Sequence, residues 1–289
     1  MSELWIPSPS PDCQNLIGGQ LRPGSGPALQ INSPYTGATL SRLQVSTAAD
    51  VDEAVQAAQL AWPAWRSLPL RERLEPLANL RAGLLDRLDE ISLTIAAESG
   101  KTPAEARAGV LRGIEVMDFA LSLQNSDSGA ALDVSRGVSC EYRRDGLGVV
   151  VGITPFNFPV MVPLWMIPIA LSVGNAFILK PSEKVPLSAL ALGQLAQRAG
   201  YPPGIFSVVQ GDRNTAEALV SHPLVQAVAF VGSSDVARSV YARAATAGKR
   251  ALCLGGAKNQ MIVVPDADPE LTAKAVVDSF TGCAGQRCM

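Results

Sequence analysis

The stretch LGVVVGITPFNFP at residues 147–159 decides the fold. An almost unbroken apolar run leads into threonine, proline and asparagine, which is typical of a strand that is buried on both faces and ends at a loop. Further runs of this kind follow: AFILK (176–180), FSVVQ (206–210), AVAFVG (227–232), ALCLG (251–255) and MIVVP (261–265). Helical patterns separate the first five strands, near residues 164–173, 186–199, 213–221 and 234–247. The sequence therefore predicts the α/β class, with a doubly wound parallel sheet covered by helices on both faces.

The residues before this stretch predict helices behind an irregular arm. Residues 1–45 carry strand and turn signals, such as NLIGG at 15–19. Helical spacing follows at 48–62, 70–98 and 103–123, and VSCEYRR at 138–144 alternates like a strand.

One segment has the length of a membrane span. From Gly146 to Leu179 the chain runs for 34 residues without a charge. Prolines at 155, 159, 163 and 168 interrupt it, and each removes a backbone hydrogen bond that lipid cannot replace. We therefore interpret the segment as a buried run of strand, loop and helix, and expect no membrane partner.

The composition excludes several classes of protein. The 24 Lys and Arg residues nearly balance the 26 Asp and Glu residues, so no basic surface for a nucleic acid is expected. Five cysteines without a CxxC pair and a single histidine, His222, argue against a disulfide framework, a metal site and a Ser-His-Asp triad. These features favour a reducing compartment, the cytoplasm, with the mitochondrial matrix as the alternative if a targeting segment lies outside this sequence.

Ligands of such sheets bind beyond the carboxyl ends of the strands. Polar residues follow three of these ends, at 154–159, 180–183 and 232–235. No GxGxxG motif follows the first strand, so the pattern alone indicates only an α/β protein that binds a nucleotide.

Four motifs, in this order and at these separations, resemble the aldehyde dehydrogenase superfamily: PFNFP (155–159), LKPSE (179–183), FVGSS (230–234) and GQRC (285–288). INSPYTG at 31–37 and ESGK at 98–101 extend the resemblance to essentially the whole chain. Within the superfamily, the segments that look like the CoA-acylating methylmalonate-semialdehyde dehydrogenase branch are FNFPVMVPLW (156–165), GAKNQ (256–260) and GQRCM (285–289).

The resemblance implies that Cys288 is the catalytic nucleophile. Its thiolate would attack an aldehyde, and the Asn157 side-chain amide and the Cys288 backbone N–H would hold the oxyanion. Loss of a hydride to NAD would leave a thioester on the sulfur. Arg287 would favour the thiolate if its guanidinium lies close to that sulfur. The alternative for Cys288 is a buried structural thiol, as we expect for Cys13, Cys140, Cys253 and Cys283.

The resemblance also implies three loops that bind NAD, formed by Thr154, Pro155 and Phe156, by Lys180, Ser182 and Glu183, and by Gly232 and Ser233. Lys180 and Glu183 match a pair that binds the adenosine ribose. A carboxylate at this position accepts a hydrogen bond from the 2′-hydroxyl of NAD but repels the 2′-phosphate of NADP, so NAD is the expected cofactor. Ser233 opens a helix whose free N–H groups suit a pyrophosphate. The alternatives are a loop salt bridge for Lys180 and Glu183, and an ordinary helix cap at Ser233.

The same resemblance suggests the fate of the thioester. The glutamate that activates water in hydrolytic relatives would align with Leu254, which cannot do so, and CoA is therefore the expected acyl acceptor and co-substrate. Arg112 and Arg287 match two arginines that hold a substrate carboxylate. They indicate malonate semialdehyde or its methyl derivative, with loss of carbon dioxide. A surface ion pair is the alternative for Arg112. The alternative to CoA is that Leu254 merely ends a core strand and another residue performs deacylation.

Chains of this family are nearly twice as long, so we expect a C-terminally truncated chain. The expected parts are an N-terminal arm and helices (1–136), an oligomerisation-type strand (137–146), an NAD-binding α/β domain (147–255) and the beginning of a catalytic domain (256–289). The full-length form is expected to be a homo-oligomer. Two other functions stay open: a non-catalytic module that binds NAD or family subunits, and a hydrolytic aldehyde dehydrogenase with another substrate.

Overall fold

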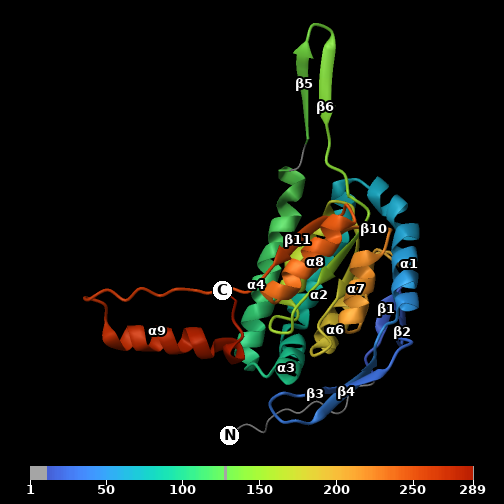
Figure 1. Ribbon diagram of the computed structural model, residues 1–289. Helices are drawn as coiled ribbons and strands as arrows, with labels where there is room; N and C mark the ends of the chain where they lie inside the picture. The colour runs from blue at the N-terminus through green and yellow to red at the C-terminus, as the bar shows by residue number, and fades with distance from the viewer. Residues whose placement is uncertain (1–11, 127–128, 289) are drawn as a thin grey trace.

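The computed structural model describes residues 12–126 and 129–288, and its centre is a seven-stranded sheet (Figure 1). The strand order is β11-β10-β7-β8-β9-β1-β2. The first five of these strands are parallel, and β1 and β2 add an antiparallel edge. The strands are β1 (Asn15–Ile17), β2 (Gln20–Arg22), β7 (Val149–Ile153), β8 (Ala176–Lys180), β9 (Phe206–Val208), β10 (Val225–Val231) and β11 (Arg250–Leu254). The predicted parallel α/β sheet is thus confirmed.

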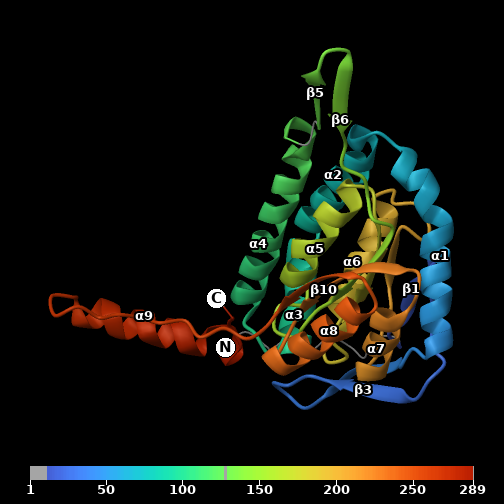
Figure 2. The same ribbon diagram turned by 45° about the horizontal axis from the view of Figure 1, so that its top comes forward.

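Helices cover both faces of the sheet. Helices α5 (Met161–Ser172) and α6 (Pro186–Arg198) pack on one face, and α1 (Ala48–Ser67), α7 (Arg213–Ser221) and α8 (Ser234–Thr246) pack on the other. Helices α2 (Leu70–Asp86), α3 (Leu88–Ser99) and α4 (Pro103–Leu121) form an outer layer over α5 and α6. Figure 2 shows α4 and α5 side by side along their length.

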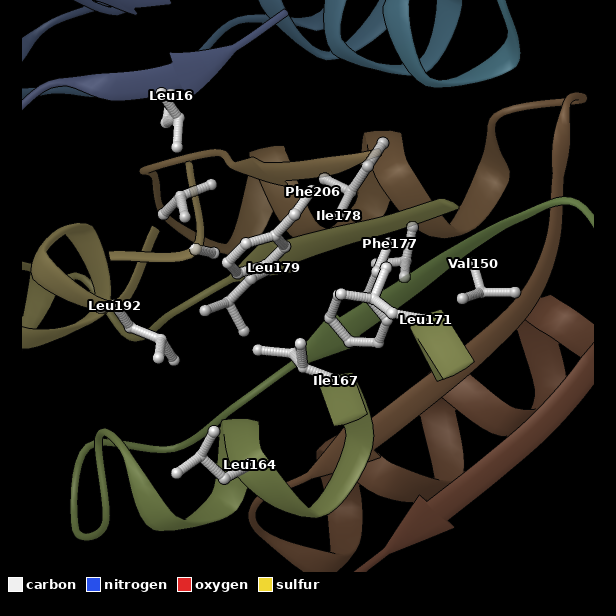
Figure 3. Packing of buried hydrophobic residues seen from close by; sticks show 14 of the residues in the cluster. Leu16, Val150, Leu164, Ile167, Leu171, Phe177, Ile178, Leu179, Leu192 and Phe206 are labelled. Atoms are coloured by element: carbon white, nitrogen blue, oxygen red, sulfur yellow. The ribbon is translucent and has the colours of Figure 1, made fainter. Parts of the chain in front are cut away.

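The two central strands are buried along their whole length, which explains their continuous apolar sequence. Every residue of β7 and β8 is buried. Phe177 of β8 is 1% exposed and fills the space next to Gly152, where an added β-carbon would lie 2.4 Å from the ring atom Cζ. Ile167 and Leu171 of α5 close the same part of the core (Figure 3). Gly152 is therefore required by close packing.

The chain order of the strands creates a crevice at one edge of the sheet. The chain passes from β7 to β8 and β9 in one direction, then returns to β10 and β11 on the other side of β7. The order reverses between β7 and β10, and ligands of open α/β sheets bind at such a point, beyond the carboxyl ends of the strands. The loops that follow Ile153, Lys180 and Val231 all lie at this edge.

Two sequence predictions for the fold are wrong. The single helix predicted over 70–98 is broken at Arg87, whose φ of −112° and ψ of 21° are not helical. The strand predicted at 261–265 is an irregular segment, and Ile262 within it is 89% exposed. An apolar run forms a buried strand only where it can pair with the edge of a sheet and pack under a covering layer. This segment leaves the sheet after β11. It leads to helix α9 (Pro269–Thr281), which the sequence analysis missed and which projects from the body in Figures 1 and 2.

Two hairpins stand outside the main sheet. Strands β3 (Ala28–Asn32) and β4 (Thr39–Gln44) form one, and β5 (Ala130–Ser135) and β6 (Val138–Tyr142) form the other. The strand predicted at 138–144 corresponds to β6, whereas its partner β5 was not predicted. Figure 1 shows the second hairpin reaching beyond the helices. Among the described residues, no helix is long and apolar enough to cross a bilayer.

Candidate active site and cofactor cleft

The crevice between β7 and β10 opens into a pocket of about 430 Å³. Ile153, Lys180 and Glu183 line its side at the sheet. Lys180 Nζ lies 3.4 Å from Glu183 Oε2, and the Lys180 side chain is only 6% exposed. Burial lowers the pKa of Lys180, and Glu183 and then Asp212 oppose that shift. The salt bridge named as the alternative is therefore present, although its lysine is buried, and the same pair lines the pocket.

The opposite wall of this pocket comes from α7 and α8. Ala216 and Val220 of α7 face Val236 and Val240 of α8 across it, and Arg213 also lines it. An apolar slot beside a charged pair suits a flat aromatic base attached to a sugar. The sequence analysis missed this wall. Its signal was the spacing of two valines four residues apart, just after the FVGSS motif.

The loop after β10 is tightly packed at Gly232. Gly232 N donates to Leu254 O at 3.1 Å, and a β-carbon at Gly232 would lie 2.5 Å from Phe230 Cζ. Ser233 is the N-cap residue of α8, and its side chain makes no capping hydrogen bond. The Ser233 side chain therefore leaves the first-turn N–H groups of α8 uncapped. An anion site at a helix N-terminus requires such free N–H groups.

Thr154 directly follows β7 and begins the loop at the carboxyl end of this strand. Its backbone N donates to Lys180 O at 3.1 Å, which joins the loop after β7 to the end of β8. Its hydroxyl Oγ1 is buried and has no hydrogen-bond partner among the residues that the structure describes. The loop continues through Pro155 to Phe156, whose ring centroid lies 4.8 Å from Lys184 Nζ.

A second pocket, of about 650 Å³, joins α4 to the C-terminal segment. Arg112 of α4 lines it together with Arg287 and Cys288, which lie far along the chain. The pocket thus brings together three predicted site residues. Arg112 also forms an exposed ion pair with Glu115, with 2.9 Å between Nη1 and Oε2. Both interpretations of Arg112 therefore have a basis in the structure.

Asn157 lies beside the segment that leads to Cys288. Its side-chain Nδ2 donates to Gln286 O at 2.8 Å. Asn259 Nδ2 in turn donates to the Cys288 carbonyl at 3.3 Å. The thiol that Arg287 contacts is that of Cys283, at 3.7 Å from Nη2. The sequence analysis made an effect of Arg287 on Cys288 conditional on a guanidinium close to the Cys288 sulfur. Leu254 ends β11 and is 44% exposed, so it does not end a buried core strand.

The ESGK motif contributes two buried ionisable side chains that the sequence analysis did not assign to the site. Lys101 Nζ lies 3.6 Å from the ring centroid of Phe158, and burial lowers its pKa, opposed by Cys283 and Glu105. Glu98 accepts hydrogen bonds from the Leu187 and Ser188 backbone N–H groups, at 2.9 and 3.1 Å, at the start of α6. Within the described part of the chain, no cluster of three or more His, Cys, Asp or Glu residues could hold a metal ion.

Comparison with known proteins identifies clear relatives. A family model described as the aldehyde dehydrogenase family matches residues 22–289. Malonate-semialdehyde dehydrogenase 1 of Geobacillus kaustophilus (strain HTA426) is 44% identical over 278 residues, which are 96% of this chain and 57% of that protein. Malonate-semialdehyde dehydrogenase 1 of Oceanobacillus iheyensis is 41% identical over 286 residues, which are 98% of this chain and 59% of that protein.

Solved structures agree with these sequence matches. A methylmalonate-semialdehyde dehydrogenase from Oceanimonas doudoroffii aligns with a TM-score of 0.94 and 39% identity, over 96% of this chain and 57% of that chain. A protein from Sinorhizobium meliloti 1021, described as a methylmalonate-semialdehyde dehydrogenase in complex with NAD, aligns with a TM-score of 0.93 and 37% identity, over 100% of this chain and 58% of that chain. The chain thus spans somewhat more than half the length of these relatives.

Proposed function

This chain belongs to the aldehyde dehydrogenase family, and from that premise we propose that the protein oxidises a short carboxylated aldehyde with NAD and transfers the acyl group to CoA. The observation that carries the proposal is the shared pocket of Arg112, Arg287 and Cys288. A thiol and two guanidinium groups around one cavity suit a substrate with an aldehyde at one end and a carboxylate at the other.

The residues around Cys288 would perform the covalent step. The thiolate would attack the aldehyde carbon, and the carbonyl oxygen would become an oxyanion. The Asn157 amide, which now donates to Gln286 O, would turn its N–H to this oxygen, and the Cys288 backbone N–H would add a second donor. Such donors stabilise charge that develops only in the transition state, so they accelerate the reaction.

The crevice fits NAD on three independent grounds. The slot between α7 and α8 suits an adenine, Glu183 at its edge suits a ribose hydroxyl, and the α8 N-terminus beside Gly232 suits a pyrophosphate. When bound, NAD supplies the acceptor for the hydride. We propose NAD rather than NADP because the Glu183 carboxylate would repel a 2′-phosphate.

CoA is the proposed acyl acceptor. Leu254 offers no carboxylate to activate water, so the thioester would persist until a stronger nucleophile arrives. With malonate semialdehyde, the overall reaction with NAD and CoA would yield acetyl-CoA, carbon dioxide and NADH, which balances in atoms and in charge. The names of the malonate-semialdehyde dehydrogenases at 41–44% identity support this substrate class.

Kinetics of the full-length protein would test the proposal. NADH formation from malonate semialdehyde should depend on CoA and should be lost in Cys288→Ser. Arg112→Ala should raise KM for this substrate by about tenfold to a hundredfold, as expected for a lost charged hydrogen bond, but should barely change KM for propanal. Arg107→Ala, on the same helix and paired with Asp89, is the matched control. NADH formation without CoA at an equal rate would contradict the acylating step.

We also propose that the protein forms a homo-oligomer through the β5–β6 hairpin. Leu132, Val134, Val138 and Tyr142 of this hairpin are each at least half exposed. An apolar hairpin that protrudes from the body needs a cover, and a second copy is the simplest partner. Sedimentation should show that Val134→Lys reduces the oligomer size, and an unchanged size would exclude this surface.

A further inference from the structure

Cys283 is a second thiol in the pocket that holds Cys288. Both cysteines line the same cavity of about 650 Å³. Cys283 is 5% exposed and packs with Phe158 and Met161, and Cys288 packs against the same apolar cluster. The two cysteines therefore line one cavity, although the sequence analysis assigned Cys283 a structural role only.

Charged groups surround the Cys283 sulfur. Arg287 Nη2 lies 3.7 Å from it, and the Lys101 ammonium interacts with it electrostatically. The Cys283 backbone N–H donates to Glu105 Oε1 at 2.6 Å, which anchors this residue to α4. A disulfide forms when a thiolate attacks an oxidised sulfur, and these contacts place two cationic side chains beside the Cys283 sulfur. A purely structural thiol needs no such neighbours.

The backbone around Cys283 is strained and tightly turned. Cys283 and Ala284 have φ values of 56° and 55°, and Gly285 follows with 71°. Left-handed backbone costs roughly 1–2 kcal/mol for each non-glycine residue, and such strain clusters at functional sites. Residues 286–288 then form no regular secondary structure. Four residues separate the two cysteines, so the turn keeps them close along the chain and no helix or strand holds them apart.

We propose that Cys283 is the resolving thiol of Cys288, and that the two form a reversible disulfide when the enzyme meets a peroxide. The inference rests on the proposed role of Cys288 as nucleophile. The Cys288 thiol would give its proton to solvent and attack hydrogen peroxide as a thiolate, forming a sulfenic acid, and the departing hydroxide would take up a proton from solvent and leave as water. The Cys283 thiolate would then attack that sulfur, form the S–S bond and expel the hydroxyl as a second water. The two thiols supply the two electrons, and a dithiol reductant would restore them.

Peptide mapping of the full-length protein tests the bond directly. Trypsin cleaves after Lys274 and Arg287, so Cys283 and Cys288 fall in different peptides. After treatment with peroxide, a linked pair should appear whose mass is two hydrogens below the sum of the two peptides, and dithiothreitol should abolish it. This measurement uses the unmodified sequence, so it does not depend on the folding of any variant. Cys288 found as sulfinic acid, with no linked pair, would overturn the proposal.

Recovery of activity provides a second test. Dithiothreitol should restore most of the activity of the peroxide-treated unmodified enzyme. In Cys283→Ala the recovered activity should be several-fold lower, because a Cys288 sulfenic acid without a partner thiol is oxidised further. Cys253→Ala, a half-buried cysteine on β11, is the matched control and should recover like the unmodified enzyme. Equal recovery in Cys283→Ala would contradict the proposal. Failure of the untreated enzyme to form NADH would instead reject the proposed function, while the peptide map would still report on the thiol pair.

Discussion

Replacing Glu98 by glutamine should make the stability of the protein less dependent on pH. Glu98 is 2% exposed and lies at the end of α3, where it accepts hydrogen bonds from the start of α6. The Ser188 hydroxyl also donates to it. Burial raises the pKa of Glu98 from 4.5 to about 7, because desolvation of the charge outweighs these hydrogen bonds.

The size of the effect follows from the two pKa values. In the unfolded chain the carboxyl loses its proton near pH 4.5, whereas in the folded protein it keeps it until about pH 7. Between these values the folded state binds more protons, so the free energy of unfolding falls as the pH rises. One pKa unit corresponds to about 1.4 kcal/mol, so the loss across this window is on the order of 3 kcal/mol.

Urea unfolding at pH 5 and pH 8 would measure this loss. The unmodified protein should lose on the order of 3 kcal/mol more than Glu98→Gln between the two values. Lys101, Lys180 and Lys249, whose pKa values burial lowers, contribute equally to both proteins and cancel in the comparison. Glu217→Gln is the control, because its ion pair with Arg213 lowers the pKa of Glu217 and moves its titration below this window. An equal fall in the free energy of unfolding between pH 5 and pH 8 in the unmodified protein and in Glu98→Gln would refute the reasoning.

Three other substitutions probe the site and the core. Asn157→Ala should slow single-turnover NADH formation roughly 10²–10³-fold with little change in KM, as for a lost oxyanion donor, and a change in KM alone would contradict that role. Glu183→Gln should reduce the ratio of kcat/KM for NAD over NADP, because the carboxylate no longer repels the 2′-phosphate; an unchanged ratio would exclude Glu183 as the determinant. Gly152→Ala should lower the free energy of unfolding by about 1–3 kcal/mol in urea, since the new β-carbon would lie 2.4 Å from Phe177 Cζ; stability equal to that of the unmodified protein would show that the core relaxes freely.

Much of the central sheet could be predicted because its signals are local. The apolar runs that became β7 and β8 are continuous, and the four helices between the five strands lie within a few residues of their predicted bounds. The apolar run at 261–265 has the same composition but forms no strand. The difference shows that apolar composition identifies a segment that can become a buried strand. Whether the segment does so depends on a free sheet edge to pair with and a layer of helices to cover it.

The sequence by itself determined the α/β class, the position of each loop at the carboxyl ends of the strands and the motif that contains Cys288, because each depends on residues close together along the chain. Only the tertiary structure decided which distant residues share a site. It places Arg112 of α4 in one pocket with Cys288, adds Val236 and Val240 to the slot that we propose for the cofactor, and pairs Arg287 with Cys283. These relations depend on how α4, α7 and α8 pack against the sheet and the C-terminal segment. Contacts between elements that are far apart in the chain produce no local sequence pattern, so they could not be predicted from the sequence.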